Sequence, residues 1–168
     1  GARTSRATIH RGTWTQISGN PMPIDEHIAS PRPEPEAASR NLVSISPFFI
    51  VKDLTVAIAH YVERFGFQLD FQDPPDDAYY GQVSRDGIGI MLKAINPDVH
   101  PCPNHTRHEW ARWDAYVYTL DPDALFREFR QRGAEFVKEL SFIDEGLWGF
   151  EVTDADRYVI AFFCIRNE

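Results

Sequence analysis

The stretch FIVKDLTVAIAHYVERFGF, residues 49–67, carries the pattern that decides the fold. Asp53 is a residue type preferred at helix N-caps, and Gly66 is the type preferred just after a helix ends. Between them, apolar residues recur at the spacing of one helix face: Leu54, Ala57, Ile58 and Tyr61. The pattern predicts a helix from Asp53 to about Phe65 that follows a strand within residues 44–51.

The same pattern returns 68 residues later, in DPDALFREFRQRG at residues 121–133. Asp121 stands at the N-cap, Pro122 at the first helical position and Gly133 at the end. The turn at Asp86 also has a counterpart 68 residues on, at Asp154, and an apolar run follows each turn. The repeat predicts two copies of one supersecondary unit that share a core.

Each copy is expected to have the element order β-α-β-β-β, and together they form an α+β fold. A helix on one side of each four-stranded mixed sheet leaves the other side to curve around a cleft. We expect one domain over residues 41–168, with modules at 41–95 and 112–168 joined by a polar segment. The expected strands are 44–51, 67–71, 78–83 and 88–93, then 114–119, 136–140, 148–152 and 158–165.

Residues 1–40 are expected to form a flexible leader and linker, because PRPEPEAAS at 31–39 cannot bury a core. The alternative is an arm that packs on a partner subunit through Trp14 or Ile24. Met22 is a candidate native start, with the residues before it derived from expression.

Composition narrows the class of partner. A net charge of −8 and a pI of about 5.2 argue against nucleic acid and mildly favour cationic or neutral ligands. No apolar run reaches the length of a membrane span, and no signal-peptide core is present. Cys102 and Cys164 lack CxxC spacing, which excludes zinc ribbons and disulfide frameworks and favours a reducing, cytoplasmic setting.

Alternation along the strands assigns their faces. In the first strand Ile45, Phe49 and Val51 should face the helix, as should Ile160, Phe162 and Cys164 in the last. The opposite parity should face the cleft, and it is aromatic with a few polar groups, as is typical of a small-molecule pocket. These residues are Ser46, Phe48, Ile50, Gly89, Met91, Lys93, Asp114, Tyr116, Tyr118, Val159, Ala161 and Phe163.

From about residue 41 to 167 the chain resembles the vicinal oxygen chelate superfamily, which holds glyoxalase I, extradiol dioxygenases, fosfomycin-resistance enzymes and bleomycin-resistance proteins. The bleomycin-resistance-like branch is the most similar. The motifs that carry the resemblance are Phe49-x-Val51-x-Asp53-Leu54, Ala57 through Tyr61 to Phe65-Gly66-Phe67, Asp121-x-Asp123-Ala124-Leu125, Arg132-Gly133, Trp148-Gly149 and Asp154-x-Asp156.

Metal enzymes of that superfamily place ligands on the first and fourth strands of both units. The resemblance puts these positions at Ser46 and near Met91, then at Asp114 and Ala161. Only Asp114 suits a divalent metal, which needs three or more such groups. The resemblance therefore implies no metal, no cofactor and no catalytic residue.

Other candidate chemistry is weaker. His105 and His108 lie three residues apart in the inter-unit segment, with His100 and Glu109 nearby. They are either a loop metal site or a solvated pair. No GxSxG elbow or other activated nucleophile is present.

The resemblance and the aromatic face together predict a metal-free protein that sequesters a small molecule, cationic or neutral, with antibiotics of the bleomycin type as the leading class. The alternatives are a metal-dependent lyase, isomerase or dioxygenase, and a ligand-free interaction module. A homodimer is expected. Asp114 is the expected anchor for a ligand cation, or else a salt-bridge partner of Arg112 or Lys93, and at least one of Trp110, Trp113 and Trp148 should line the pocket. The predicted ligand-binding residues are Phe48, Met91, Trp113, Asp114, Tyr116, Tyr118, Trp148 and Phe163.

Overall fold

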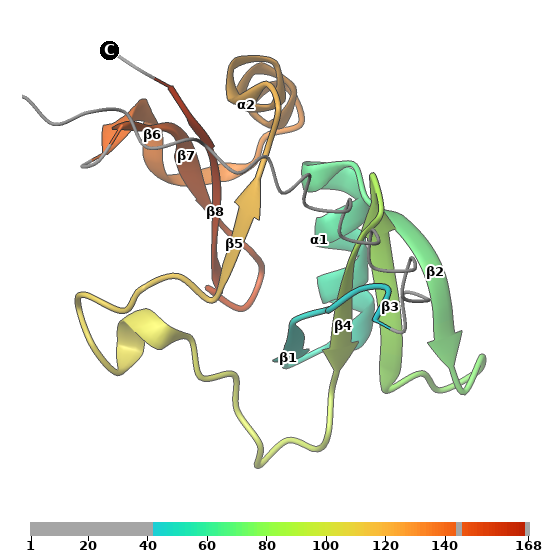
Figure 1. Cartoon of the computed structure of the whole chain (residues 1–168). Coiled ribbons are helices and arrows are strands. Elements are labelled where there is room, and N and C mark those ends of the chain that lie inside the picture. The colour runs from blue at the N-terminus through green and yellow to red at the C-terminus, as the bar shows by residue number, and fades with distance from the viewer. Residues whose placement is uncertain (1–41, 144–145, 167–168) are drawn as a thin grey trace, which may run out of the picture. The chain divides into compact units, whose positions relative to one another are not determined.

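The computed structural model describes residues 42–143 and 146–166. The expectations about residues 1–40, including Trp14, Met22 and Ile24, lie outside this part of the chain. The described residues form two four-stranded mixed sheets, each with one helix (Figure 1). The predicted α+β fold of two β-α-β-β-β units is confirmed.

The first unit comprises a short strand, a helix and three further strands. Its sheet has the order β1-β4-β3-β2, with β1 parallel to β4 and the other neighbours antiparallel. The bounds are β1 Phe48–Ile50, α1 Leu54–Phe65, β2 Gln68–Asp73, β3 Tyr80–Arg85 and β4 Ile88–Lys93.

The second unit repeats this order as β5-β8-β7-β6, with β5 parallel to β8. A segment with one short 3-10 helix, η1 at Asn104–Thr106, connects the two units. The bounds are β5 Ala115–Tyr118, α2 Pro122–Gln131, β6 Glu135–Ile143, β7 Leu147–Thr153 and β8 Val159–Ile165.

Both helices begin and end as the repeat predicts. The Asp53 carboxylate accepts a hydrogen bond from the Val56 N–H at 2.9 Å, and Asp121 accepts one from the Ala124 N–H at 2.9 Å. Gly66 follows α1 with φ of 68° and Gly133 follows α2 with φ of 75°, a left-handed conformation that glycine adopts without strain.

One face of each sheet packs on its helix and forms the core. Phe49, Val51, Ile160 and Phe162 are buried there, as the strand alternation predicts. The prediction for Ile45 is wrong, because its side chain is 93% exposed. Strand β1 begins only after Pro47, whose missing N–H is tolerated at the start of a strand but not within a paired ladder.

The two units contact each other through their helices and through the β3–β4 and β7–β8 turns. The rings of Phe65 and Phe129 stack with centroids 5.1 Å apart. The Tyr61 hydroxyl, on α1, donates to the Asp154 carboxylate at 2.9 Å, and both groups are buried. These contacts make one continuous core from both copies of the repeat.

Candidate functional site

Four of the predicted site residues lie together on the face of the second sheet opposite α2, called here the helix-free face. The Tyr116 ring lies 5.3 Å from Trp113, 5.0 Å from Tyr118 and 5.7 Å from Phe163, measured between centroids. Trp113 also lies 5.8 Å from Phe163. We call these four residues the aromatic cluster.

The strand register explains how the cluster forms. Parallel pairing of β5 with β8 sets Tyr118 opposite Phe163 and Tyr116 opposite Ala161. On the next strand Phe163 is opposite Gly149, where a Cβ atom would lie 2.5 Å from the Phe163 ring. Gly149 thus leaves the room that the fully buried Phe163 ring occupies.

An ion pair between a buried carboxylate and a partly exposed guanidinium adjoins the cluster. Glu151 lies two residues after Gly149 on the same face, opposite Ala161, and its side chain is fully buried. Arg112 donates to both carboxylate oxygens, from Nε at 2.9 Å and from Nη2 at 2.5 Å. Its guanidinium also lies 5.9 Å from the centre of the Trp113 ring. The hydrogen bond to Glu151 raises the pKa of Arg112 above its ordinary value.

Sequence reasoning missed this pair. Glu151 interrupts an otherwise apolar strand, and the alternation of Gly149, Glu151 and Thr153 along β7 was a signal that placed it on the helix-free face. The sequence-based prediction names Arg112 only as a salt-bridge partner of Asp114.

Two polar atoms of the cluster are buried without a partner. Neither the Trp113 Nε1 nor the Tyr116 hydroxyl has a hydrogen-bond partner among the described residues. Buried polar atoms are normally paired with protein or with ordered water, so these two donors are available to a water or to a bound molecule. Burial also raises the pKa of the Tyr116 hydroxyl, so it stays protonated at neutral pH.

Asp114 has a different environment from the one expected. Its Oδ1 accepts from the Asn104 N–H and its Oδ2 from the Val159 N–H, both at 2.8 Å. The carboxylate therefore fastens the connecting segment to β8. The expected salt bridges are also replaced, because Arg112 pairs with Glu151 and the Lys93 ammonium lies over the Tyr79 and Tyr80 rings.

The other tryptophans are not in the cluster. Trp148 shares the parity of Phe150, which packs on α2, and its Nε1 donates to Asp123 of α2 at 2.9 Å. Trp148 thus lies on the helix side of the sheet, away from the aromatic cluster in which it was expected. Trp110 is 85% exposed in the connecting segment. Of the three candidates, Trp113 joins the cluster.

Phe48 and Met91 belong to the first sheet. They are opposite each other in the parallel β1–β4 pair, and Phe48 is 48% exposed. The Phe48 ring stacks on Tyr80 at 6.1 Å, and Tyr80 lies 5.3 Å from Phe71. The first sheet therefore has a smaller aromatic group of its own.

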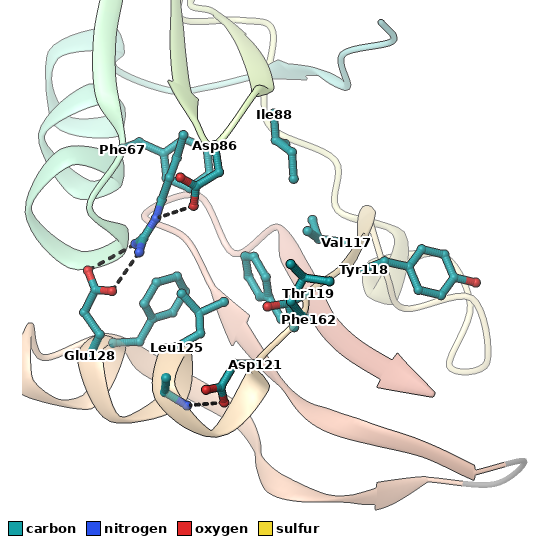
Figure 2. Close-up of a pocket in the computed structure, with 14 residues that line it drawn as sticks. Phe67, Asp86, Ile88, Val117, Tyr118, Thr119, Asp121, Leu125, Glu128 and Phe162 are labelled. Atoms are coloured by element: carbon teal, nitrogen blue, oxygen red, sulfur yellow. Dashed lines mark hydrogen bonds and ion pairs between the residues drawn. The ribbon is translucent and has the colours of Figure 1, made fainter. Parts of the chain in front are cut away.

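A cavity of about 440 Å³ lies where the two units meet (Figure 2). The charged groups of its lining are already paired: Arg85 donates to both oxygens of Glu128 and pairs with Asp86, and Asp121 caps α2. Tyr118 is the predicted site residue that lines it, and Figure 2 shows the Tyr118 ring pointing away from the other labelled side chains. The cavity is lined by Phe67, Arg85, Asp86, Ile88, Val117, Tyr118, Thr119, Leu120, Asp121, Ala124, Leu125, Glu128, Phe129 and Phe162.

Comparison with known families gives one match that covers most of the chain. Residues 42–162 match the Glyoxalase/Bleomycin resistance protein/Dioxygenase superfamily. The chain belongs to this superfamily. No curated protein matches the chain.

Solved structures support the fold at low sequence identity. TioX from Micromonospora sp. ML1 is 20% identical, with a TM-score of 0.55, over 73% of this chain and 99% of TioX. A superfamily protein from Alicyclobacillus acidocaldarius is 19% identical, with a TM-score of 0.57, over 74% of this chain and 92% of its own. A bleomycin-binding protein, solved with bleomycin, is 17% identical, with a TM-score of 0.54, over 76% of this chain and 100% of its own.

The donor set does not fit the divalent metal of the superfamily's enzymes. Ser46, Met91, Asp114 and Ala161 include one carboxylate, and both of its oxygens accept backbone hydrogen bonds. Among the described residues, no three His, Cys, Asp or Glu side chains gather as a metal site, and this includes His105 and His108. Within the same part of the chain, no helix is long and apolar enough to cross a membrane.

Proposed function

We propose that this protein binds and sequesters a small, partly planar molecule on the helix-free face of its second sheet. The observation that carries the proposal is the aromatic cluster, in which three ring systems surround Tyr116 within 6 Å. Membership of the superfamily supports small-molecule binding as the general role. Antibiotics of the bleomycin type remain the leading ligand class, because one protein of the same fold binds bleomycin.

The proposed binding would depend on stacking of the ligand on the rings of the cluster, next to the Arg112–Glu151 ion pair. Contact between aromatic rings contributes about 0.5–1.5 kcal/mol beyond the area that is buried. The cluster presents such rings beside polar donors, which is the composition of a site that orients a ligand as well as burying it.

Binding without catalysis is the reading that the donor set favours. The inherited metal positions lack the ligands for Lewis-acid chemistry, and the carboxylate that sits beside the cluster, Glu151, is neutralised by Arg112. The alternative is a metal-dependent lyase, isomerase or dioxygenase. Metal analysis of the purified protein separates the two.

We propose further that the protein acts as a homodimer. Strands β1 and β5 each form an edge of their sheet, and apolar side chains there are open to solvent. Phe48 is 48% exposed, Tyr118 is 71% exposed and Leu120 is fully exposed. A second copy that covers these edges would bury them.

Sedimentation at micromolar concentration tests the dimer. We expect Leu120→Glu to yield monomers, because it places a charge in the buried edge. Val56→Glu, on the exposed surface of α1, is the control and should leave the dimer intact. A monomeric wild-type protein would contradict the proposal.

Tryptophan fluorescence and thermal shift test ligand binding. Bleomycin and related compounds that bind the native state should raise the melting temperature by mass action. Trp113→Ala should weaken binding about 2- to 13-fold, as expected for the loss of one stacking contact. Trp110→Ala is the matched control, since Trp110 is outside the cluster. Equal effects of the two substitutions would contradict the site.

A further inference from the structure

We infer that the ligand presents hydrogen-bond acceptors, as carbonyl or carboxylate groups on an aromatic ring system, and that Arg112 binds them. This inference rests on the proposed function and specifies the chemistry of its ligand. Arg112 replaces Asp114 as the polar anchor of the site, because both carboxylate oxygens of Asp114 already accept backbone hydrogen bonds.

The first step concerns hydrogen-bond donors that lack acceptors. The cluster includes Trp113 and Tyr116, whose rings lie 5.3 Å apart. Arg112 directly precedes Trp113 in the chain, and its guanidinium lies 5.9 Å from the centre of the Trp113 ring. The Arg112 Nη1, the Trp113 Nε1 and the Tyr116 hydroxyl have no acceptor among the described residues. Guanidinium and indole groups can only donate. A ligand complementary to this group of donors must therefore bring acceptors.

The second step concerns how Arg112 is held. Glu151 accepts from Nε and Nη2, which fixes one edge of the guanidinium and leaves the Nη1 edge for another partner. Glu151 is fully buried, whereas the Arg112 side chain is 40% exposed. Since a guanidinium binds carboxylates and carbonyls through such an edge, Glu151 positions Arg112 for an acceptor.

The third step concerns charge. The protein has a net charge of −8, which alone would favour a cation. At this site, however, both oxygens of Glu151 and both oxygens of Asp114 are already hydrogen-bonded. The Arg112 guanidinium, by contrast, is partly exposed beside the cluster and lies 5.9 Å from the centre of the Trp113 ring.

A purely structural role for the Arg112–Glu151 pair would explain fewer of these observations. A buried ion pair often stabilises a fold no more than well-packed apolar residues of similar volume. A structural pair also leaves the two buried donors, the Trp113 Nε1 and the Tyr116 hydroxyl, without acceptors among the described residues. Binding of an acceptor-bearing ring accounts for the ion pair and the donors together.

Three probes of one size test the inference on the full-length protein: 2-naphthoate, neutral 2-acetylnaphthalene and cationic 2-naphthylmethylammonium. Affinities are measured by titration calorimetry and tryptophan quenching. We expect 2-naphthoate to bind about tenfold or more tightly than the ammonium probe. Arg112→Ala should remove that preference, and Arg112→Lys should restore part of it.

Two controls separate recognition from folding. Arg130→Ala breaks the exposed Arg130–Glu139 pair on the helix side of the same unit and should leave all three affinities unchanged. The double variant Arg112→Gln with Glu151→Gln removes both charges together, so no buried charge is left unpaired. It should keep the native circular dichroism spectrum and lose the preference for 2-naphthoate.

The outcomes distinguish this inference from the proposed function. If all three probes bind equally, or the cation binds most tightly, the assignment of Arg112 is wrong while small-molecule binding stands. If none of the probes binds while a bleomycin-type compound does, this inference is contradicted and the proposed function stands; if neither binds, both are contradicted. A preference for 2-naphthoate that survives in both Arg112→Ala and the double variant would also overturn the assignment.

Discussion

Arg64 and Arg132, which are 68 residues apart, each donate a hydrogen bond to the end of the other's helix. Arg64 Nη1 donates to the Arg132 carbonyl at 2.9 Å, and Arg132 Nη1 donates to the Glu63 carbonyl at 3.4 Å. The last carbonyls of a helix lack partners within it, so each arginine completes the end of the opposite helix. Equivalent positions of the sequence repeat thus make reciprocal contacts between the two units.

This reciprocity predicts that the two arginines stabilise the same junction. Arg64→Ala and Arg132→Ala should each lower the free energy of unfolding by about 0.5–1.5 kcal/mol, the usual value of one such hydrogen bond. Urea denaturation measures both variants and the double variant. Arg132 also pairs with Glu128, so its substitution should cost the more of the two. A neutral effect of both changes would contradict the role of the junction.

Gly149→Ala tests how the aromatic cluster is supported. The added methyl would collide with the Phe163 ring and the strand behind it. Overpacking of this kind costs about 1–3 kcal/mol, and displacement of Phe163 should also weaken ligand binding. Gly89→Ala is the control, since its methyl would meet side chains at 3.2–3.3 Å that can move. Thermal unfolding of the two variants should differ clearly, and equal melting temperatures would count against the packing described.

The sequence was sufficient to predict the fold and one part of the site. Caps such as Asp53 and Asp121 are local signals, and the 68-residue offset related them across the chain. Strand parity likewise brought Tyr116 and Phe163 to one face. The alternation along β7 that puts Glu151 on the helix-free face also puts Trp148 on the helix side, a signal that the prediction for Trp148 did not use.

Other features depend on contacts that no local pattern encodes. The pairing of Arg112 with Glu151 joins residues 39 positions apart. The carboxylate of Asp114 accepts hydrogen bonds from backbone N–H groups of two separate segments. Whether a polar residue meets a ligand or the protein's own backbone is decided by tertiary structure.

Asp154 should make the stability of the protein depend on pH. Burial is the main cause that raises its pKa from 3.8 to about 6. The folded state then holds the proton more tightly than the unfolded chain. Stability therefore falls as the pH rises from about 4 to 6 and levels off above that. The full difference is about 3 kcal/mol.

Asp154→Asn isolates this effect, because the amide remains uncharged at every pH. Relative to Asp154→Asn, the wild-type protein should lose stability between pH 4 and 6 in urea titrations. His60 has a lowered pKa and acts in the opposite direction within this range, so the difference between the two proteins is the informative quantity. Asp76→Asn, at an exposed carboxylate, should show no such difference. A pH-independent difference for Asp154→Asn would refute the assignment.

Asp114 distinguishes a structural carboxylate from a metal ligand. Asp114→Ala removes the acceptor of two backbone N–H groups, and we expect a loss of about 1–3 kcal/mol in the free energy of unfolding. Because this role needs no metal, the melting temperature of the wild-type protein should not change when a chelator is added. Elemental analysis should find no stoichiometric zinc, iron, manganese or nickel, since Ser46, Met91 and Ala161 cannot complete a hard-ligand site. About one metal per chain, lost in Asp114→Ala, would instead show that Asp114 is a ligand and would favour the enzymatic alternative.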